Sequence, residues 1–177
     1  MDQLRYPIGR FERPGTLSAT DRESAISEIE VLPGQLSAAV ANWDDKRLDT
    51  PYRPDGWTVR QVLHHVADSH MTSYLRFKLA LTEDEPTIKP YKEDEWAKLA
   101  DATAPVQPSL DLLSLLHHRW VLLLRSIEPD QWNRTFRHPE RGLMRLDTNL
   151  MLYAWHGKHH LAHITGLAGR MGWPQQG

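Results

Sequence analysis

The sequence of 177 residues contains no cysteine. This absence excludes disulfides, thiol nucleophiles and thiolate metal sites, so any metal ion must be bound by His, Asp or Glu. No apolar run approaches the roughly 20 residues that cross a bilayer, and the segment Met1–Pro7 lacks the apolar core of a signal peptide. We therefore expect a cytoplasmic protein with no membrane partner.

Neither sign of charge is in large excess. The chain has 21 Lys and Arg against 23 Asp and Glu, which gives a formal net charge of −2. A general nucleic-acid-binding protein usually carries a basic face, so we expect no nucleic-acid partner and instead a small-molecule substrate. The length and the 40% apolar content fit one domain over residues 1–177.

Helical patterns dominate the chain after an irregular arm of residues 1–17, which is rich in turn-forming residues. We find no convincing strand pattern. The sequence therefore predicts an all-α fold, an antiparallel four-helix bundle with a long crossover connection. The expected helices span residues 19–43, 58–81, 110–127 and 147–171.

Local signals mark the expected helix boundaries. Pro33 should break or kink the first helix, because proline lacks a backbone donor and clashes one turn back. Thr58 and Gln61 have the spacing of a capping box at the start of the second helix. Asp147 is a good N-cap for the last helix, and Gly172 follows its end.

The connection over residues 83–108 is charged and interrupted by prolines, with a possible short helix at residues 94–100. Connections of this length inside a compact domain often line a functional site. We therefore expect this segment to cross one face or one end of the bundle.

The last predicted helix holds four of the ten histidines. His156 and His160 lie one turn apart in the middle of its apolar stripe, between Tyr153 and Ile164. A lone buried histidine is more often a hydrogen-bonded core residue, but two at this spacing can bind one metal ion. His159 and His163 lie nearer the edge of the stripe.

Two helical histidines do not complete a site, because zinc usually has three protein ligands. The second helix offers His64, His65 and His70, and its periodicity does not decide between His64 and His65. Asp68 lies one turn further on and could orient a ligand imidazole. On the third helix, His117 and His118 fit a packing or hydrogen-bonding role better than ligation.

The sequence resembles the DinB-like family of metal-binding helical bundles and its metal-dependent hydrolases. The resemblance extends over most of the chain, including residues 56–71, 118–120 and 153–165. It implies metal ligation by His65, His156 and His160, because these positions match the family's ligands. It also implies a four-helix bundle with a right-handed crossing between its halves, a homodimer, and one ion per subunit.

Three neutral imidazoles would leave a divalent ion with its full charge, which favours ionisation of bound water and hydrolysis of an ester or amide. Zinc is the default expectation and nickel also suits imidazole. The sequence identifies no catalytic base. The candidates for supporting or substrate contacts are Asp68, Asn149, Tyr153 and His159.

Two other functions fit the same metal site. Some relatives of this kind resemble enzymes that join a low-molecular-weight thiol to electrophiles, in which the ion ionises the thiol. That reaction needs a basic pocket for an anionic thiol, and the candidate residues are Arg53, Arg60, Arg76 and Arg119. A non-enzymatic protein, in which the ion only holds the helices together, is the third hypothesis.

Overall fold

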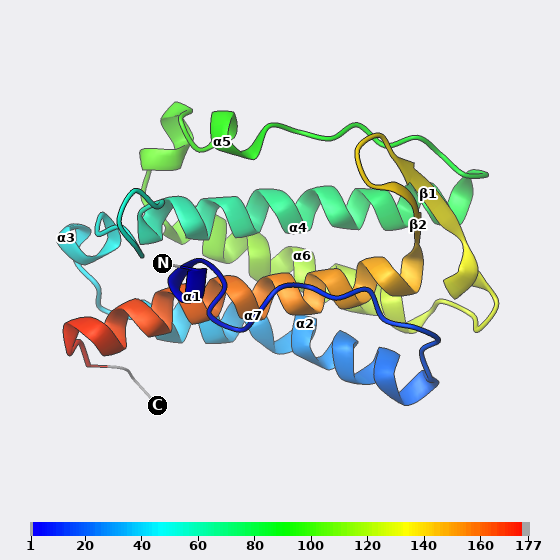
Figure 1. Ribbon diagram of the computed structural model, residues 1–177, viewed down its shortest axis with the longest axis horizontal. Helices are drawn as coiled ribbons and strands as arrows, with labels where there is room; N and C mark the ends of the chain where they lie inside the picture. Colours follow the sequence, from blue (N-terminus) through cyan, green and yellow to red (C-terminus); the bar gives the residue numbers. More distant parts are fainter. Residues whose placement is uncertain (1, 175–177) are drawn as a thin grey trace.

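The computed structural model describes residues 2–174 and contains four long helices packed as a bundle (Figure 1). The bundle agrees with the expected fold. Short helices and 3-10 turns lie in its connections. The long helices are α2 (Ala19–Ala39), α4 (Val59–Thr82), α6 (Gln107–Arg125) and α7 (Leu146–Met171). The short elements are α1 (Asp2–Arg5), α3 (Asp45–Leu48), α5 (Glu93–Trp96), η1 (Ala100–Thr103) and η2 (Gln131–Asn133).

The long connection between α4 and α6 determines the directions of the helices. It runs back along α4, so α6 begins at the same end of the bundle as α4 and runs parallel to it (Figure 1). Helices α2 and α7 run the opposite way. The long crossover that the sequence predicted is thus present, and because it recrosses the bundle, the two helices that it joins are parallel while each is antiparallel to α2 and α7.

A small antiparallel hairpin precedes α7, contrary to the expectation of no strands. Strands β1 (Thr135–His138) and β2 (Gly142–Arg145) pair in a register that places Phe136 opposite Met144. Both of these side chains are buried in the core. Each strand has only four residues, which is too short for alternation to distinguish it from a loop.

Helix α2 is one continuous helix with Pro33 inside it, so the predicted break is absent. The side chain of Pro33 is buried, and packing within the bundle outweighs its low helix propensity. The helix ends at Ala39 instead of residue 43. Its proline still removes one backbone donor, the N–H that would have bonded the carbonyl of Ile29.

Other predicted boundaries shift by a few residues. Helix α7 begins at Leu146 with Arg145 as its N-cap, so the assignment of the N-cap to Asp147 was wrong. Asp147 lies in the first turn, where it is buried and paired with Arg145. Helix α6 begins earlier than expected, with Pro108 in its first turn, where a missing N–H has little cost.

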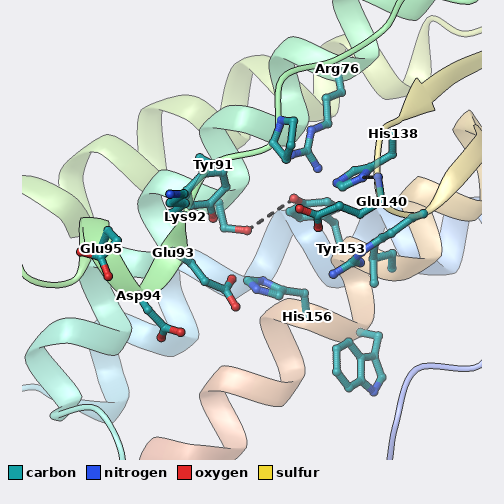
Figure 2. Close-up of a pocket in the computed structure, with 15 residues that line it drawn as sticks. Arg76, Tyr91, Lys92, Glu93, Asp94, Glu95, His138, Glu140, Tyr153 and His156 are labelled. Atoms are coloured by element: carbon teal, nitrogen blue, oxygen red, sulfur yellow. Dashed lines mark hydrogen bonds between the residues drawn. The ribbon is translucent and has the colours of Figure 1, made fainter.

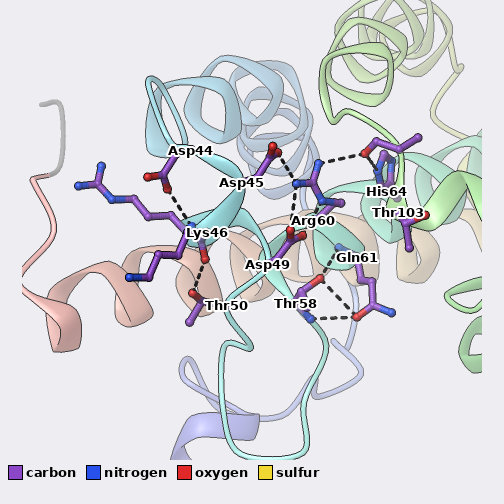
Figure 3. Close-up of polar contacts among 12 residues, drawn as sticks. Asp44, Asp45, Lys46, Asp49, Thr50, Thr58, Arg60, Gln61, His64 and Thr103 are labelled. Carbon is purple, nitrogen blue, oxygen red and sulfur yellow. Dashed lines mark hydrogen bonds and ion pairs between the residues drawn. The ribbon is translucent and has the colours of Figure 1, made fainter.

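The start of α4 is held by polar contacts (Figure 3). The predicted capping box between Thr58 and Gln61 is confirmed. Arg60 donates to Asp49 Oδ1 at 2.6 Å, to Asp45 Oδ1 at 2.7 Å and to the carbonyl of Ala104 at 3.1 Å. The hydrogen bond with Asp49 raises the pKa of this guanidinium. Arg60 therefore joins α3, α4 and the crossover, and it is not available to a ligand.

The apolar core consists of two clusters with a polar layer between them. One cluster includes Phe77, Trp120 and Leu150, and the other includes Val62 and Ile164. Between these positions, the helices α4, α6 and α7 carry buried histidines and serines. The layer comprises His65, Ser69, His70, Ser73, His117, His159, His160 and His163. Buried polar groups are costly unless they are hydrogen-bonded or bind a ligand, so this layer marks the candidate site.

Gly157 permits close packing of α7 on α2 at this level. A Cβ atom at Gly157 would lie 2.4 Å from Cδ2 of Leu32, which is itself buried. Glycine therefore brings the neighbouring ligand candidate His156 close to the centre of the bundle. Among residues 2–174, no helix combines the length and the apolar character that a membrane span requires.

Candidate metal centre

Three histidines converge where the middle of α7 faces α4. Candidate ligand atoms of His65, His156 and His160 all lie within 4.8 Å of one another. The Nε2 atoms of His65 and His156 are 3.3 Å apart. His65 and His160 are buried and His156 is partly buried. The structure thus brings together the three residues that the sequence and its resemblance predicted as ligands.

Burial keeps these imidazoles neutral. Loss of solvation lowers the pKa of His65 to about 4 and lowers the pKa values of His156 and His160 well below the ordinary 6.5. A metal ion binds the neutral form of imidazole. The three side chains are therefore in the protonation state that metal binding requires at neutral pH. The Nδ1 atom of His160 is buried and has no hydrogen-bond partner in the part of the chain that the structure describes.

A chain of hydrogen bonds leads away from His156 through two further histidines. His156 Nδ1 lies 3.1 Å from His70 Nε2, and His70 Nδ1 lies 2.9 Å from His117 Nε2. His117 Nδ1 lies 2.6 Å from the carbonyl oxygen of Ile29. His70 and His117 are 0% and 1% exposed, so no bulk water replaces these partners.

The carbonyl of Ile29 determines every tautomer in this chain. A carbonyl oxygen only accepts, so His117 must donate from Nδ1, and a neutral His117 then accepts at Nε2. His70 must consequently donate from Nδ1 and accept at Nε2. His156 in turn donates from Nδ1, which leaves the lone pair of its Nε2 directed toward His65. A hydrogen bond that fixes the tautomer of a ligand histidine in this way also fixes the direction of the lone pair that binds the metal ion.

Pro33 explains why the carbonyl of Ile29 is free to accept. In a regular helix the N–H of residue 33 would bond this carbonyl, and proline has no N–H. The residue expected to break the first helix thus releases an acceptor at the level of the histidines. His117 occupies that acceptor from α6 and completes the chain.

These buried histidines predict a loss of stability in acid. Burial lowers the pKa of His117 to about 4, so between pH 6.5 and pH 4 the unfolded chain binds a proton that the folded chain does not. Stability is then complete above about pH 6.5 and falls as the pH decreases. Each such histidine contributes about 1.4 kcal/mol per pH unit within this window. Urea unfolding of the metal-free protein at pH 7, 6 and 5 measures the slope.

A matched pair on α6 provides the control. His117→Gln removes a buried histidine. We expect it to reduce the dependence of the unfolding free energy on pH by the contribution of one histidine, about 1.4 kcal/mol per pH unit. His118→Gln replaces an exposed neighbour and should leave the slope as it is in the parent protein. A free energy of unfolding that does not change between pH 7 and pH 5 would contradict the prediction.

A second group of histidines, His159, His160 and His163, also has ligand atoms within 4.8 Å of one another. It shares His160 with the first group and lies entirely on α7. His159 stacks on Trp155 with ring centroids 4.5 Å apart, and His163 Nε2 donates to the carbonyl of Arg5 at 3.1 Å. The ring centroid of His159 also lies 6.0 Å from that of Tyr6, so both His159 and His163 contact the N-terminal part of the chain.

The first group lies between two cavities. One cavity of about 500 Å³ is lined by His156, Ser69 and Tyr153 (Figure 2), and another of about 420 Å³ is lined by His65 and Asp68. Tyr91 and Glu93 of the crossover line both cavities. The long connection therefore lines the candidate site, as its length suggested, and a small molecule can approach the histidines from either side.

The structure separates the four supporting candidates. Tyr153 lines the larger cavity, and its hydroxyl lies 3.4 Å from Ser69 Oγ, which donates to it. Asp68 lines the smaller cavity and forms no hydrogen bond with a histidine ring among residues 2–174. The ring that does bond a candidate ligand is His70, which pairs with His156. Asn149 is fully buried and donates to Ser73 Oγ at 3.0 Å, and His159 faces Tyr6 of the arm.

His64 has a structural role that periodicity did not distinguish from ligation. Its Nδ1 lies 2.7 Å from Ser109 Oγ and its Nε2 lies 3.1 Å from the carbonyl of Ala104. Ala104 belongs to the segment that leads into α6, and Ser109 lies in the first turn of α6. His64 thus holds the end of the crossover against α4, while its neighbour His65 faces the site.

Glu93 was missed at the level of the sequence. It begins α5 within the crossover, and its carboxyl group points toward His156 (Figure 2). Although Glu93 is exposed as a residue, partial desolvation and the nearby carboxylate of Asp94 raise the pKa of its carboxyl group. Only the path of the crossover brings this residue to the site. No local pattern distinguishes it from Asp94 and Glu95.

Comparison with models of protein families identifies the family of this chain. The model of the DinB superfamily matches residues 28–164, a range that includes α4, α6 and all three converging histidines. The protein belongs to the DinB superfamily. The resemblance seen in the sequence is thereby confirmed.

Relatives within this superfamily are similar over almost their full length. A protein from Bacillus mycoides (strain KBAB4) named "Putative metal-dependent hydrolase" is 57% identical over 98% of this chain and 100% of its own. A relative from Bacillus cereus (strain B4264) with the same description is 56% identical over the same shares.

Two solved structures have the same fold. YfiT from Bacillus subtilis, described as a probable metal-dependent hydrolase with an unusual four-helix bundle topology, is 48% identical. It covers 97% of this chain and 99% of its own, with a TM-score of 0.95. The four-helix bundle protein TT2238 has a TM-score of 0.57 at 21% identity, over 82% of this chain and 98% of its own, and supports the fold alone.

Proposed function

We propose that this DinB superfamily protein is a metal-dependent hydrolase whose ion is bound by His65, His156 and His160. The observation that carries the proposal is the convergence of three neutral imidazoles from two helices between two cavities. Three histidine ligands with an open position are typical of catalytic zinc, and they also suit nickel. The descriptions of the relatives as metal-dependent hydrolases support the same class.

The residues around the ligands are suited to hydrolysis. A bound divalent ion would act as a Lewis acid and lower the pKa of water toward 7. The carboxyl group of Glu93 has a raised pKa, so it can accept a proton from water and return it to a leaving group. The hydroxyl of Tyr153, one turn before His156, is positioned to donate to a substrate carbonyl oxygen.

The test is conversion of matched substrate panels by protein loaded with one equivalent of zinc or nickel. One panel contains esters and amides, the other contains thiols paired with electrophiles, and mass spectrometry follows the products. We expect turnover in the first panel, its loss after metal removal, and a decrease of about 100-fold in Glu93→Gln. Absence of turnover in the ester and amide panel would overturn the proposal.

Thiol transfer is the second candidate, and the observation that favours it is a basic group in the larger cavity. Of the four arginines considered for an anionic thiol, only Arg76 lines that cavity. Arg60 is paired with Asp45 and Asp49, Arg53 donates to Tyr52 and Pro54, and Arg119 is exposed. Turnover confined to the thiol panel would support this reaction. Turnover in neither panel, with unfolding on metal removal, would support a purely structural ion.

A further inference from the structure

Arg76 is a buried cation without a partner. It lies on α4, lines the cavity that contains His156, and is 9% exposed. Its guanidinium group points into that cavity (Figure 2). No hydrogen bond or ion pair joins its side chain to any other of residues 2–174. A guanidinium group is always charged, and since this one has no counter-charge among the described residues, it is available to an anionic group that enters the cavity.

His138 offers a second unused donor beside Arg76. The ring is 6% exposed, and its Nδ1 accepts a hydrogen bond from the backbone N–H of Glu140 at 3.2 Å. Burial, with the nearby charge of Arg76, lowers the pKa of His138, so the ring is neutral. A neutral imidazole that accepts at Nδ1 carries its proton on Nε2. In the described part of the chain, that Nε2–H has no acceptor, and the ring lines the same cavity.

The cavity has an exposed rim and a buried floor, and Arg76 and His138 belong to the floor. The charged residues at its rim are all exposed, and their four carboxylates and two cations give the rim a formal net charge of −2 that solvent screens. The floor instead combines buried Arg76 and His138 with the hydroxyl groups of Ser69 and Tyr153. The rim residues are Lys92, Glu93, Asp94, Glu95, Glu140 and Arg141. The floor itself has one positive charge, that of Arg76, beside neutral donors, and with an acidic rim this suits a monoanion better than a doubly charged phosphate.

We propose that Arg76 and His138 bind the carboxylate group of an elongated substrate whose reacting bond lies at the three converging histidines. This inference rests on the proposed hydrolase function, for which it specifies the substrate class. Arg76 follows His65 by eleven residues, a rise of about 16 Å along α4. Helical side chains lean toward the N-terminus, so the arginine covers part of this distance. A chain of several atoms between the carboxylate and the reacting carbonyl fills the remainder.

The test compares ligands that differ only in this charge. The probes are the mono-4-nitroanilides of succinic, glutaric, adipic and pimelic acids, each paired with the analogue in which the free carboxyl is a carboxamide. Binding is measured by calorimetry with the full chain, both metal-free and zinc-loaded. We expect at least one acid to bind about tenfold or more tightly than its carboxamide, which is the effect of a charged hydrogen bond.

Variants locate the preference within the cavity. Arg76→Gln should remove the preference for the acid, whereas Lys92→Gln, which removes an exposed charge from the same rim, should retain it. Metal content and the melting temperature verify that each variant is folded. Equal binding of acid and carboxamide by the parent protein, or binding of neither in any pair, overturns the inference without any variant. An undiminished preference in Arg76→Gln also overturns it.

The two proposals fail in different ways. A preference for the acid in metal-free protein, with no cleavage of any nitroanilide or ester after metal loading, supports the carboxylate subsite and counts against hydrolysis. Cleavage of acids and carboxamides with equal efficiency supports hydrolysis and overturns the role of Arg76.

Discussion

His156→Ala is expected to abolish stoichiometric metal binding. The substitution removes one of three imidazole ligands and also disconnects the hydrogen-bond chain through His70 and His117. Two remaining ligands, His65 and His160, do not complete the three-ligand set typical of a catalytic zinc site. The loss in affinity should exceed the 10–100-fold effect of removing a residue that only orients a ligand. Elemental analysis after dialysis against a weak chelator gives the metal content per chain.

The choice of variants distinguishes the two histidine groups, which share His160. His160 belongs to both groups, so His160→Ala should also lose the metal but does not separate them. His156 belongs only to the first group, and His159 and His163 only to the second. We therefore expect His159→Ala and His163→Ala to retain close to one equivalent. Retained metal in His156→Ala, together with its loss in His163→Ala, would move the site to the face that contacts the N-terminal arm.

The helices of this fold could be predicted because their signals are local. The apolar stripe around His156 and the capping box of Thr58 each lie within a few turns of one helix. The continuity of α2 through Pro33 could not be predicted, because it depends on burial against other helices. The direction of α6 depends on how the crossover returns along α4, and the hairpin around Phe136 is too short to show a period. These features come from tertiary packing.

The candidate site was predictable to the same extent. The pair His156 and His160 follows from one helical turn, and the choice of His65 came from the resemblance and not from periodicity. The partners of the ligands lie far away in the sequence. His70 is 86 residues from His156 and 47 from His117. Glu93 and Arg76 reach the larger cavity from the crossover and from the far end of α4. No spacing rule connects residues at such separations.

His70→Phe is expected to lower metal affinity by 10–100-fold although His70 does not contact the proposed ion. Phenylalanine fills a similar volume but neither accepts from Nδ1 of His156 nor donates to Nε2 of His117. His156 then loses the bond that fixes its tautomer, and part of its population carries a proton on the ligating nitrogen. Competition with a chromophoric chelator measures the affinity for zinc, and cobalt substitution reports the ligand field.

A conservative variant separates orientation from a general effect on stability. The Oε1 atom of glutamine can occupy nearly the place of Nε2 in histidine and accept from His156 Nδ1, so His70→Gln should recover most of the affinity. His163 is also a buried, hydrogen-bonded histidine, but it lies on α7. The control variant His163→Phe should change the affinity for zinc by less than about threefold. Nitrogen-15 spectra of the metal-free protein assign the tautomer of His156, which should be Nδ1–H in the parent and in His70→Gln but mixed in His70→Phe. Unchanged affinity and an unchanged tautomer in His70→Phe would show that the histidine chain anchored at Ile29 does not orient the site.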